Sequence, residues 1–188
     1  VLVTWLLLLA TYGFAGLAGT ALPTAGVVVP FESVAATRLD AGLFVQATLL
    51  SVSQVFLKGS AIAALLFLAG LAVNSRAAAI AALAGAVVAV VTAHLLGAES
   101  DLVTGGLLGF SPVLTAVALV TVFNRPGLRV VAYAALGTVF TVVAQAAMNV
   151  ALTPLAIPAL TAPFVLVTWM FLLARPTFVG TAANQAEG

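Results

Sequence analysis

The sequence contains no cysteine, a single histidine and few charged residues. The lack of cysteine excludes disulfides, thiolate metal sites and cysteine nucleophiles. The one histidine, His94, cannot form a metal site by itself, and we interpret it as an interfacial residue rather than a proton relay. A net charge of only +1 gives no electrostatic basis for binding a nucleic acid. We therefore expect no metal, no cofactor and no nucleic-acid partner.

Apolar residues are what the sequence has in abundance. Hydrophobic residues make up 64% of the chain and charged residues 6%, whereas about a quarter of the residues in a soluble domain are charged. A membrane-spanning helix needs roughly 17–25 apolar residues, which leaves room for about six such helices. The composition therefore predicts an all-α polytopic membrane protein.

Polar and charged residues separate the apolar runs. The runs predict membrane spans at about residues 1–17, 60–74, 77–96, 104–123, 130–150 and 158–174. Residues 43–57 are too short and too polar to cross alone, and residues 179–188 form a polar tail. No Asp, Glu, Lys or Arg falls inside a predicted span, which argues against ion coupling and against a membrane-embedded enzyme.

The few charges also orient the chain. Alternating crossings place four arginines on one face of the membrane, namely Arg76, Arg125, Arg129 and Arg175. Glu99 and Asp101 fall on the other face. The positive-inside rule then assigns the arginine face, and with it the C-terminus, to the cytoplasm. We expect a protein of the plasma (inner) membrane.

A repeat links the two ends of the chain. Residues 1–14 return 164 positions later as residues 165–178, with nine of fourteen residues identical. Five spans are predicted between residues 60 and 174, and a second copy of an odd-span unit inserts upside down, as in inverted-repeat transporters. Residues 1–17 would then be the last span of an upstream repeat, residues 18–42 a linker, and residues 43–178 the second repeat. On this interpretation an N-terminal half is missing.

Two segments place polar atoms or helix breakers in apolar surroundings. Gln54, in SVSQVFLKGS (51–60), carries an amide that costs several kcal/mol if buried without a partner. A helix–helix hydrogen bond and a pore lining are both open for it. In TGGLLGFSPVL (104–114), Gly105 and Gly109 allow close helix packing and Pro112 removes a backbone donor. A packing groove with a kink is the simpler interpretation of that segment.

The third segment is TPLAIPALTAPF, residues 153–164. Pro154, Pro158 and Pro163 cannot all sit in one regular helix. Non-helical backbone at membrane depth is tolerated only inside protein or beside a watery cavity. Freed carbonyls near Thr161 would then offer acceptors to a small neutral donor molecule, whereas a surface loop is the competing interpretation. Thr161 lies where a full-length last span must begin, which favours the first.

These three segments resemble signature segments of the urea transporter family. Residues 157–164 are similar to Leu-Pro-x-x-Thr-x-Pro-Phe, with Ile157 in place of leucine and with Pro158, Thr161, Pro163 and Phe164 matching. SQVFL (53–57) resembles the family's Gln-Val segment, and GLLGFSPVL (106–114) its Gly-Leu-x-Gly-Phe-Asn-x-x-Leu segment. All three occur in the family's order and at about its spacing.

The resemblance implies a passive urea channel of two five-span halves, each with a short re-entrant helix, assembled as a homotrimer with one pore per subunit. By motif position it implies a substrate path lined by Gln54, Phe56, Phe110, Leu114 and Thr161. Gln54 would lie near one pore mouth, the apolar side chains would wall a narrow slot, and Thr161 would offer its hydroxyl near the centre. The residues expected to shape the pore are Leu57, Ser111, Pro112, Pro158, Pro163 and Phe164.

Three departures from the family pattern fall in this proposed pore. The slot aromatic commonly lies three residues after the glutamine, where this chain has Leu57, with Phe56 beside it. Lys-Gly-Ser at residues 58–60 replaces the usual Asn-Pro or Asp-Pro, and Ser111 replaces an asparagine. Ammonia or a short amide is therefore an alternative substrate. A half that conducts nothing without its N-terminal partner is the other alternative.

Overall fold

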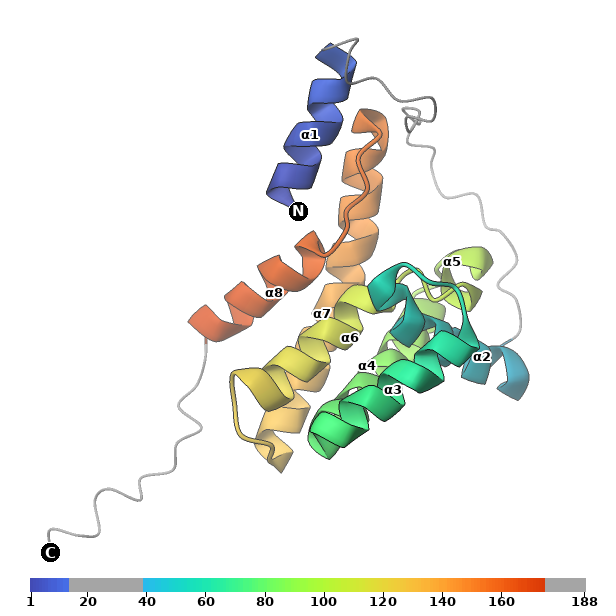
Figure 1. Ribbon diagram of the computed structural model, residues 1–188, viewed down its shortest axis with the longest axis vertical. Helices are drawn as coiled ribbons and strands as arrows, with labels where there is room; N and C mark the ends of the chain where they lie inside the picture. The colour runs from blue at the N-terminus through green and yellow to red at the C-terminus, as the bar shows by residue number, and fades with distance from the viewer. Residues whose placement is uncertain (14–38, 175–188) are drawn as a thin grey trace, which may run out of the picture.

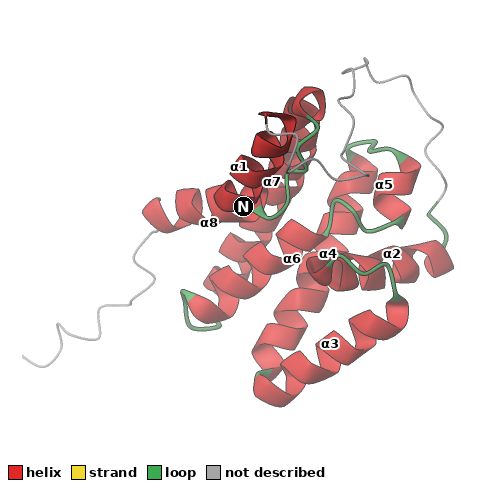
Figure 2. Ribbon diagram, turned by 45° about the horizontal axis from the view of Figure 1, so that its top comes forward, coloured by secondary structure: helices red, strands yellow, loops and turns green. Residues whose placement is uncertain are grey.

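The computed structural model describes residues 1–13 and 39–174. Within these ranges every element is a helix or a short helical turn, which confirms the all-α prediction (Figure 2). Parts of three predicted segments lie outside the described residues: the end of the first span (14–17), most of the linker (18–38) and the C-terminal stretch (175–188).

Eight α-helices follow one another along the described chain (Figure 1). The first four are α1 Leu2–Gly13, α2 Ala41–Ser53, α3 Ala61–Asn74 and α4 Arg76–Leu95. The next four are α5 Ser100–Thr104, α6 Phe110–Val117, α7 Leu128–Leu152 and α8 Ala162–Leu173. Short turns extend three of them: 3₁₀ turns at Gln54–Phe56 and Thr153–Leu155, and a π-helical turn at Ala118–Val122.

Side-chain caps start three of the helices. Asp40 accepts a hydrogen bond from Leu43 N at 2.8 Å, at the start of α2. Ser60 and Ser75 cap α3 and α4 in the same way. Such a cap satisfies one of the backbone N–H groups that the first helical turn leaves without a partner, and it contributes about 1 kcal/mol. Ser75 alone separates α3 from α4, so these two helices reverse direction within one residue.

Helix α4 is the centre of the bundle and packs against α2, α3, α6 and α7. Its buried face is made of small residues, Ala78, Ala81, Ala82, Gly85, Ala86, Ala89, Val90 and Ala93. Small side chains let helix backbones approach closely, which is the usual source of helix association in lipid. At the tightest point a Cβ on Gly85 would lie 2.6 Å from Ala116 Cβ of α6.

Two helices are long and apolar enough to cross a membrane, α4 and the Leu128–Leu155 helix that includes α7. A third span results if α2 and α3 count as one, but they are bent by 72°, the geometry of a broken span or a re-entrant loop. Two further apolar helices, Phe110–Val122 and Ala162–Leu173, are shorter. The sequence predicted six spans, whereas the described residues contain two helices that are long and apolar enough to cross a membrane, or three if α2 and α3 count as one.

Two predicted spans begin later than expected. The span predicted at residues 104–123 is interrupted, because Gly106 takes a φ of 68° and the helix starts only at Phe110. The span predicted at residues 158–174 starts at Ala162, after Leu160 with a φ of 51°. Glycine and proline inside an apolar run caused both errors, since they break a helix without changing its hydropathy.

The charged residues gather at opposite ends of the bundle. Arg76 and Glu99 flank α4 and are therefore separated by its whole length. A buried cluster joins the first half of α4 to the end of α6 and the first half of α7 (Ala81, Leu119, Val120 and Ala134). Arg125 and Arg129 thus lie at the Arg76 end. This grouping agrees with the predicted charge alternation, while the side of the membrane that each end faces stays a prediction.

Gly85→Ala is expected to lower the free energy of unfolding by about 1–3 kcal/mol, because the added methyl would lie 2.6 Å from Ala116 Cβ, which has no flexible side chain that could move aside. Gly70→Ala, in the middle of α3, is the matched control: a Cβ there has nothing within 4 Å, so the change should be neutral or stabilising by up to about 1 kcal/mol. Denaturation in detergent measures both variants. Equal effects would contradict the close contact between α4 and α6.

Candidate functional site

The chain turns sharply between α2 and α3, and residues 54–60 form this corner (Figure 1). The 3₁₀ turn after α2 ends at Leu57, whose φ of 54° lies in the left-handed region. Leu57 N donates to Gln54 O at 2.9 Å and Lys58 N to Ser53 O at 3.3 Å, so the helix end keeps backbone partners. A non-glycine residue in this conformation costs about 1–2 kcal/mol. The contacts around the corner must therefore hold it in place.

Gln54 joins the corner to the turn between α5 and α6. Its Nε2 donates to the Gly105 carbonyl at 3.3 Å. That turn approaches α2 so closely that a Cβ on Gly106 or Gly109 would overlap Ser51. The structure therefore has both the interhelical hydrogen bond considered for Gln54 and the close packing considered for the glycines. Gln54 Oε1 accepts no hydrogen bond from the described residues, which leaves an acceptor beside the corner.

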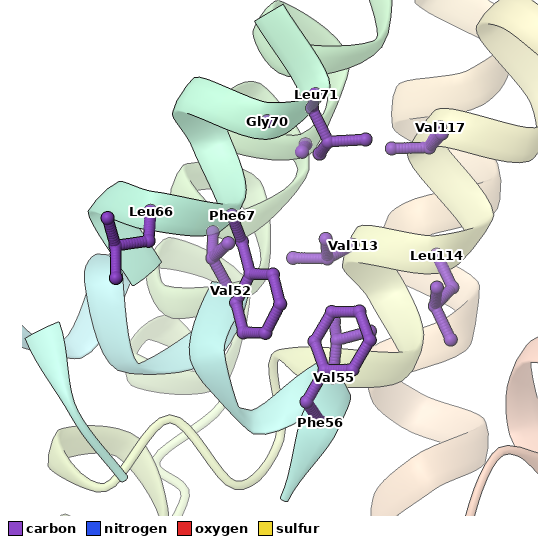
Figure 3. A pocket seen from close by; sticks show the side chains of 11 residues that line it. Val52, Val55, Phe56, Leu66, Phe67, Gly70, Leu71, Val113, Leu114 and Val117 are labelled. Atoms are coloured by element: carbon purple, nitrogen blue, oxygen red, sulfur yellow. The ribbon is translucent and has the colours of Figure 1, made fainter. Parts of the chain in front are cut away.

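An apolar groove of about 300 Å³ lies between α3 and α6, next to the corner (Figure 3). No charged or polar side chain lines it; the lining residues are Val52, Val55, Phe56, Leu66, Phe67, Gly70, Leu71, Ala82, Val113, Leu114 and Val117. The Phe56 ring stacks on Phe67 with centroids 3.9 Å apart and planes 14° apart. Phe56 and Leu66 are 60% and 69% exposed, so the groove is open on one side. Leu114 contributes an aliphatic wall from α6.

Residues 153–161 connect α7 to α8 with a single 3₁₀ turn and no longer helix. Two of them are left-handed although they are not glycine: Ala156 with a φ of 54° and Leu160 with a φ of 51°. Ala156, Ile157 and Ala159 are buried, whereas Pro154, Leu155 and Pro158 are exposed. The segment is therefore covered by protein on one side, and its place in the interior stays a prediction. Thr161 directly precedes α8, and its hydroxyl bonds to none of the described residues.

Two hydrogen bonds from other helices reach this segment. Trp5 Nε1 of α1 donates to Pro158 O at 2.9 Å, and Ser111 Oγ of α6 lies 3.4 Å from Leu160 O. Ser111 also donates to Gln145 Oε1 at 2.6 Å. A hydroxyl has one proton to donate, so the short bond to Gln145 is the principal one and the Leu160 carbonyl is a secondary partner.

A buried polar seam continues from Ser111 along α6 and α7. Gln145 Nε2 donates to Asn149 Oδ1 at 3.0 Å, and the hydroxyls of Thr115 and Thr141 are 2.9 Å apart. Hydrogen bonds between helices satisfy polar side chains that lipid cannot solvate. The seam fixes the rotation of α6, because Ser111 and Thr115 must face α7. Val113 and Ala116 of α6 pack against Gly85 of α4, and Leu114 is left to the groove.

The structure brings the predicted substrate-path residues into two groups. Phe56 and Leu114 share the groove, and Gln54 lies at the corner beside it. Thr161 belongs to the other group, next to the Leu160 carbonyl that approaches α6 from the α7 side. Phe110 links the groups, since it is one helical turn before Leu114 on the same side of α6 and begins the helix.

The residues predicted to shape the pore differ widely in exposure. Leu57 and Pro158 are exposed and Phe164 is half-buried. Three are fully buried, Ser111, Pro112 and Pro163. The buried three act on the site by fixing backbone and packing, because they present no surface to a solute.

Helix α3 supplies a wall that the sequence did not predict. Leu66, Phe67 and Leu71 line the groove opposite α6. Phe67 and Leu71 have the i, i+4 spacing of one helix face. In an apolar helix this spacing cannot distinguish a groove-facing side from a lipid-facing side. No signal in the sequence separated the two.

The model of a family described as UT: Urea transporter matches residues 1–176. The chain belongs to the urea transporter family. No curated protein matches the chain. Family membership and the apolar helices identify an integral membrane protein, and the family is one of transporters rather than enzymes, with urea as substrate.

Ser111→Ala is expected to lower stability by about 1–3 kcal/mol, because it leaves the buried Gln145 Oε1 without a donor. Ser51→Ala is the matched control: Ser51 is equally buried, but its hydroxyl bonds only to the Ala47 carbonyl of its own helix, so its loss should cost less than about 1 kcal/mol. Chemical denaturation in detergent compares the two. A larger loss for Ser51→Ala would show that the seam does not stabilise α6.

Proposed function

We propose that the chain conducts urea passively, through a slot that has the groove between α3 and α6 as one wall. The observation that carries this proposal is the pairing of the stacked Phe56 and Phe67 rings with Leu114 in a groove that no polar side chain lines. Urea is flat, with weakly polar faces and hydrogen-bonding edges. A slot of this kind contacts the faces and leaves the edges to acceptors.

Two acceptors are available for those edges. Gln54 Oε1 and the Thr161 hydroxyl have no partner among the described residues. Both residues are half-buried, and their oxygens can accept hydrogen bonds from the N–H groups of a solute. We assign Gln54 to one mouth of the pore and Thr161 to its central part, with Phe110 as the wall between them. Leu57 would shape the mouth in place of the family's usual aromatic.

The slot excludes ions by the cost of dehydration. An apolar wall cannot replace the water around a cation or anion, whereas a neutral molecule loses far less on entering. Among the described residues, Lys58 is the one charged group at the corner, and it is exposed. No described cluster of His, Cys, Asp or Glu could hold a metal ion. Diffusion down a gradient is the mechanism that fits such a lining.

A complete slot needs a second wall, because the groove is open on one side. We propose that an inverted five-span repeat supplies it, with residues 43–178 as one repeat and α1 as the last span of the other. The sequence identity between residues 1–14 and 165–178 supports this arrangement. Each repeat would contain one short re-entrant helix, here α2. A homotrimer with one pore per subunit and a cytoplasmic C-terminus complete the proposal.

Thr161→Val is expected to reduce urea flux about tenfold or more in stopped-flow measurements on proteoliposomes of the full-length protein, since it removes one acceptor at no change in volume. Thr121→Val is the control, because the Thr121 hydroxyl bonds to the backbone carbonyl of Val117 on its own helix and Thr121 does not line the groove. Its flux should equal that of the unaltered protein. Unaltered protein no faster than protein-free vesicles would end the urea proposal.

Phe110→Ala is expected to widen the slot and so to raise the flux of N-methylurea relative to urea. Ammonia and acetamide are measured alongside, because the departures at Leu57 and Ser111 favour them as alternative solutes. Saturable flux of either one that urea does not inhibit would replace urea as the assigned solute. Unchanged flux ratios in Phe110→Ala would remove Phe110 from the pore wall.

A further inference from the structure

The two tryptophans of the chain occupy equivalent positions in the repeat but differ in environment. Trp5 corresponds to Trp169, because residue 1 corresponds to residue 165. Trp5 is half-buried and donates its indole N–H to the Pro158 carbonyl at 2.9 Å. Trp169 is 62% exposed, and its indole N–H reaches no acceptor among the described residues. The tryptophan of the first copy therefore donates a hydrogen bond, and the tryptophan of the second copy donates none within the described chain.

The Trp5 bond acts on the segment that presents Thr161. Pro158 lies between the two left-handed residues Ala156 and Leu160. Backbone in that conformation is strained and keeps its shape only when neighbouring contacts hold it. The Trp5 indole holds the Pro158 carbonyl, and Ser111 lies at the Leu160 carbonyl. These two carbonyls come just before Thr161, so the position of its hydroxyl depends on both partners.

The bond is not a by-product of a tightly packed helix. Large side chains of α1 are exposed, among them Leu2, Val3, Leu6 and Leu7. Helix α1 runs beside the end of α7 and the segment that leads to α8, as both views show (Figures 1 and 2). Trp5 supplies a donor to the exposed Pro158 carbonyl from a helix 153 residues away in sequence.

The exposed stripe of α8 matches the stripe of α1 that carries Trp5. In α8 this stripe consists of Leu166, Trp169, Met170 and Leu173, all exposed. The equivalent residues of α1 are Leu2, Trp5, Leu6 and Leu9. Their i, i+3, i+4, i+7 spacing places each set on one face of its helix. In this stripe of α1, Leu2, Leu6 and Leu9 are exposed and Trp5 bonds to the proline segment, whereas Trp169 of α8 has no such partner among the described residues.

We propose that Trp5 is a positioning residue for the Thr161 hydroxyl, and that Trp169 donates in the same way to the equivalent proline carbonyl of a second, inverted repeat. The exchange is reciprocal: the closing helix of each repeat holds the solute-facing segment of the other. The acceptor for the Trp169 indole N–H is then the proline segment of that repeat. The positioning role of Trp5 rests on the proposed role of Thr161 in conduction, whereas the two hydrogen bonds do not depend on that role.

The test replaces each tryptophan of the full-length protein by benzothienylalanine, which has the shape of tryptophan with sulfur in place of the N–H. At position 5 we expect urea flux to fall about fivefold, the size of one lost hydrogen bond, with a changed ratio of urea to N-methylurea flux. The same replacement at position 169 should have the same two effects. 5-Fluorotryptophan, which keeps the N–H, should restore both values at either position.

Two further measurements separate positioning from general support. In a Thr161→Val background the position-5 replacement should no longer alter the flux ratio, because the group it positions is gone. An unchanged ratio in the original background, with only less folded protein, would overturn the positioning role. Nuclear magnetic resonance of the two indole N–H groups reports their hydrogen bonds without any urea flux. A Trp169 N–H that exchanges freely with solvent in the full-length protein would overturn the reciprocal bond, whichever solute the protein conducts.

Discussion

The need to pair every backbone N–H and C=O group inside a membrane governs this structure. The chain nevertheless leaves regular helix at residues 54–60, 105–109 and 153–161. Each interruption is closed by hydrogen bonds that reach back into the preceding helix or across to another one, as Gln54 does to Gly105 and Trp5 to Pro158. Residues 54–60 border the groove side of α6, where Phe56 and Leu114 lie, whereas Leu160 approaches α6 from the α7 side, where Ser111 lies 3.4 Å from its carbonyl. The irregular backbone thus lies next to residues of the candidate site, and the regular helices around it hold it in place.

Helix α6 connects the two parts of the candidate site because one of its sides packs on α7 and another faces the groove. One side is held to α7 by the hydroxyls of Ser111 and Thr115, and the other presents Leu114 to the stacked aromatic rings. A rotation of α6 by a fraction of a turn would break the seam and move the groove wall together. Ser111 is fully buried and holds α6 through its hydrogen bond to Gln145, and it does not line the groove.

The sequence predicted helices where an apolar run is unbroken, and it predicted non-helical backbone where several prolines lie close together. Helices α4 and α7 were placed within a few residues, and three prolines marked the Thr161 segment as non-helical. The break at Gly105–Gly109 was missed because two glycines in an apolar run resemble a packing face. The groove was not predictable, since nothing local distinguishes the side of α3 that carries Phe67 from its lipid-facing side. Nor could spacing reveal a bond between Trp5 and Pro158, which depends on how distant helices dock.

Leucine and alanine, rather than glycine, occupy the left-handed positions at residues 57, 156 and 160. Glycine would adopt these angles with less strain, but it would also leave the chain more conformations to explore. Bulkier residues restrict that freedom, so the segments beside the groove have one shape before any solute arrives. This suits a small molecule that binds weakly and offers little interaction energy to drive a rearrangement. A passage whose shape is set during folding can recognise such a molecule by fit alone, and it needs no closing step to slow each crossing.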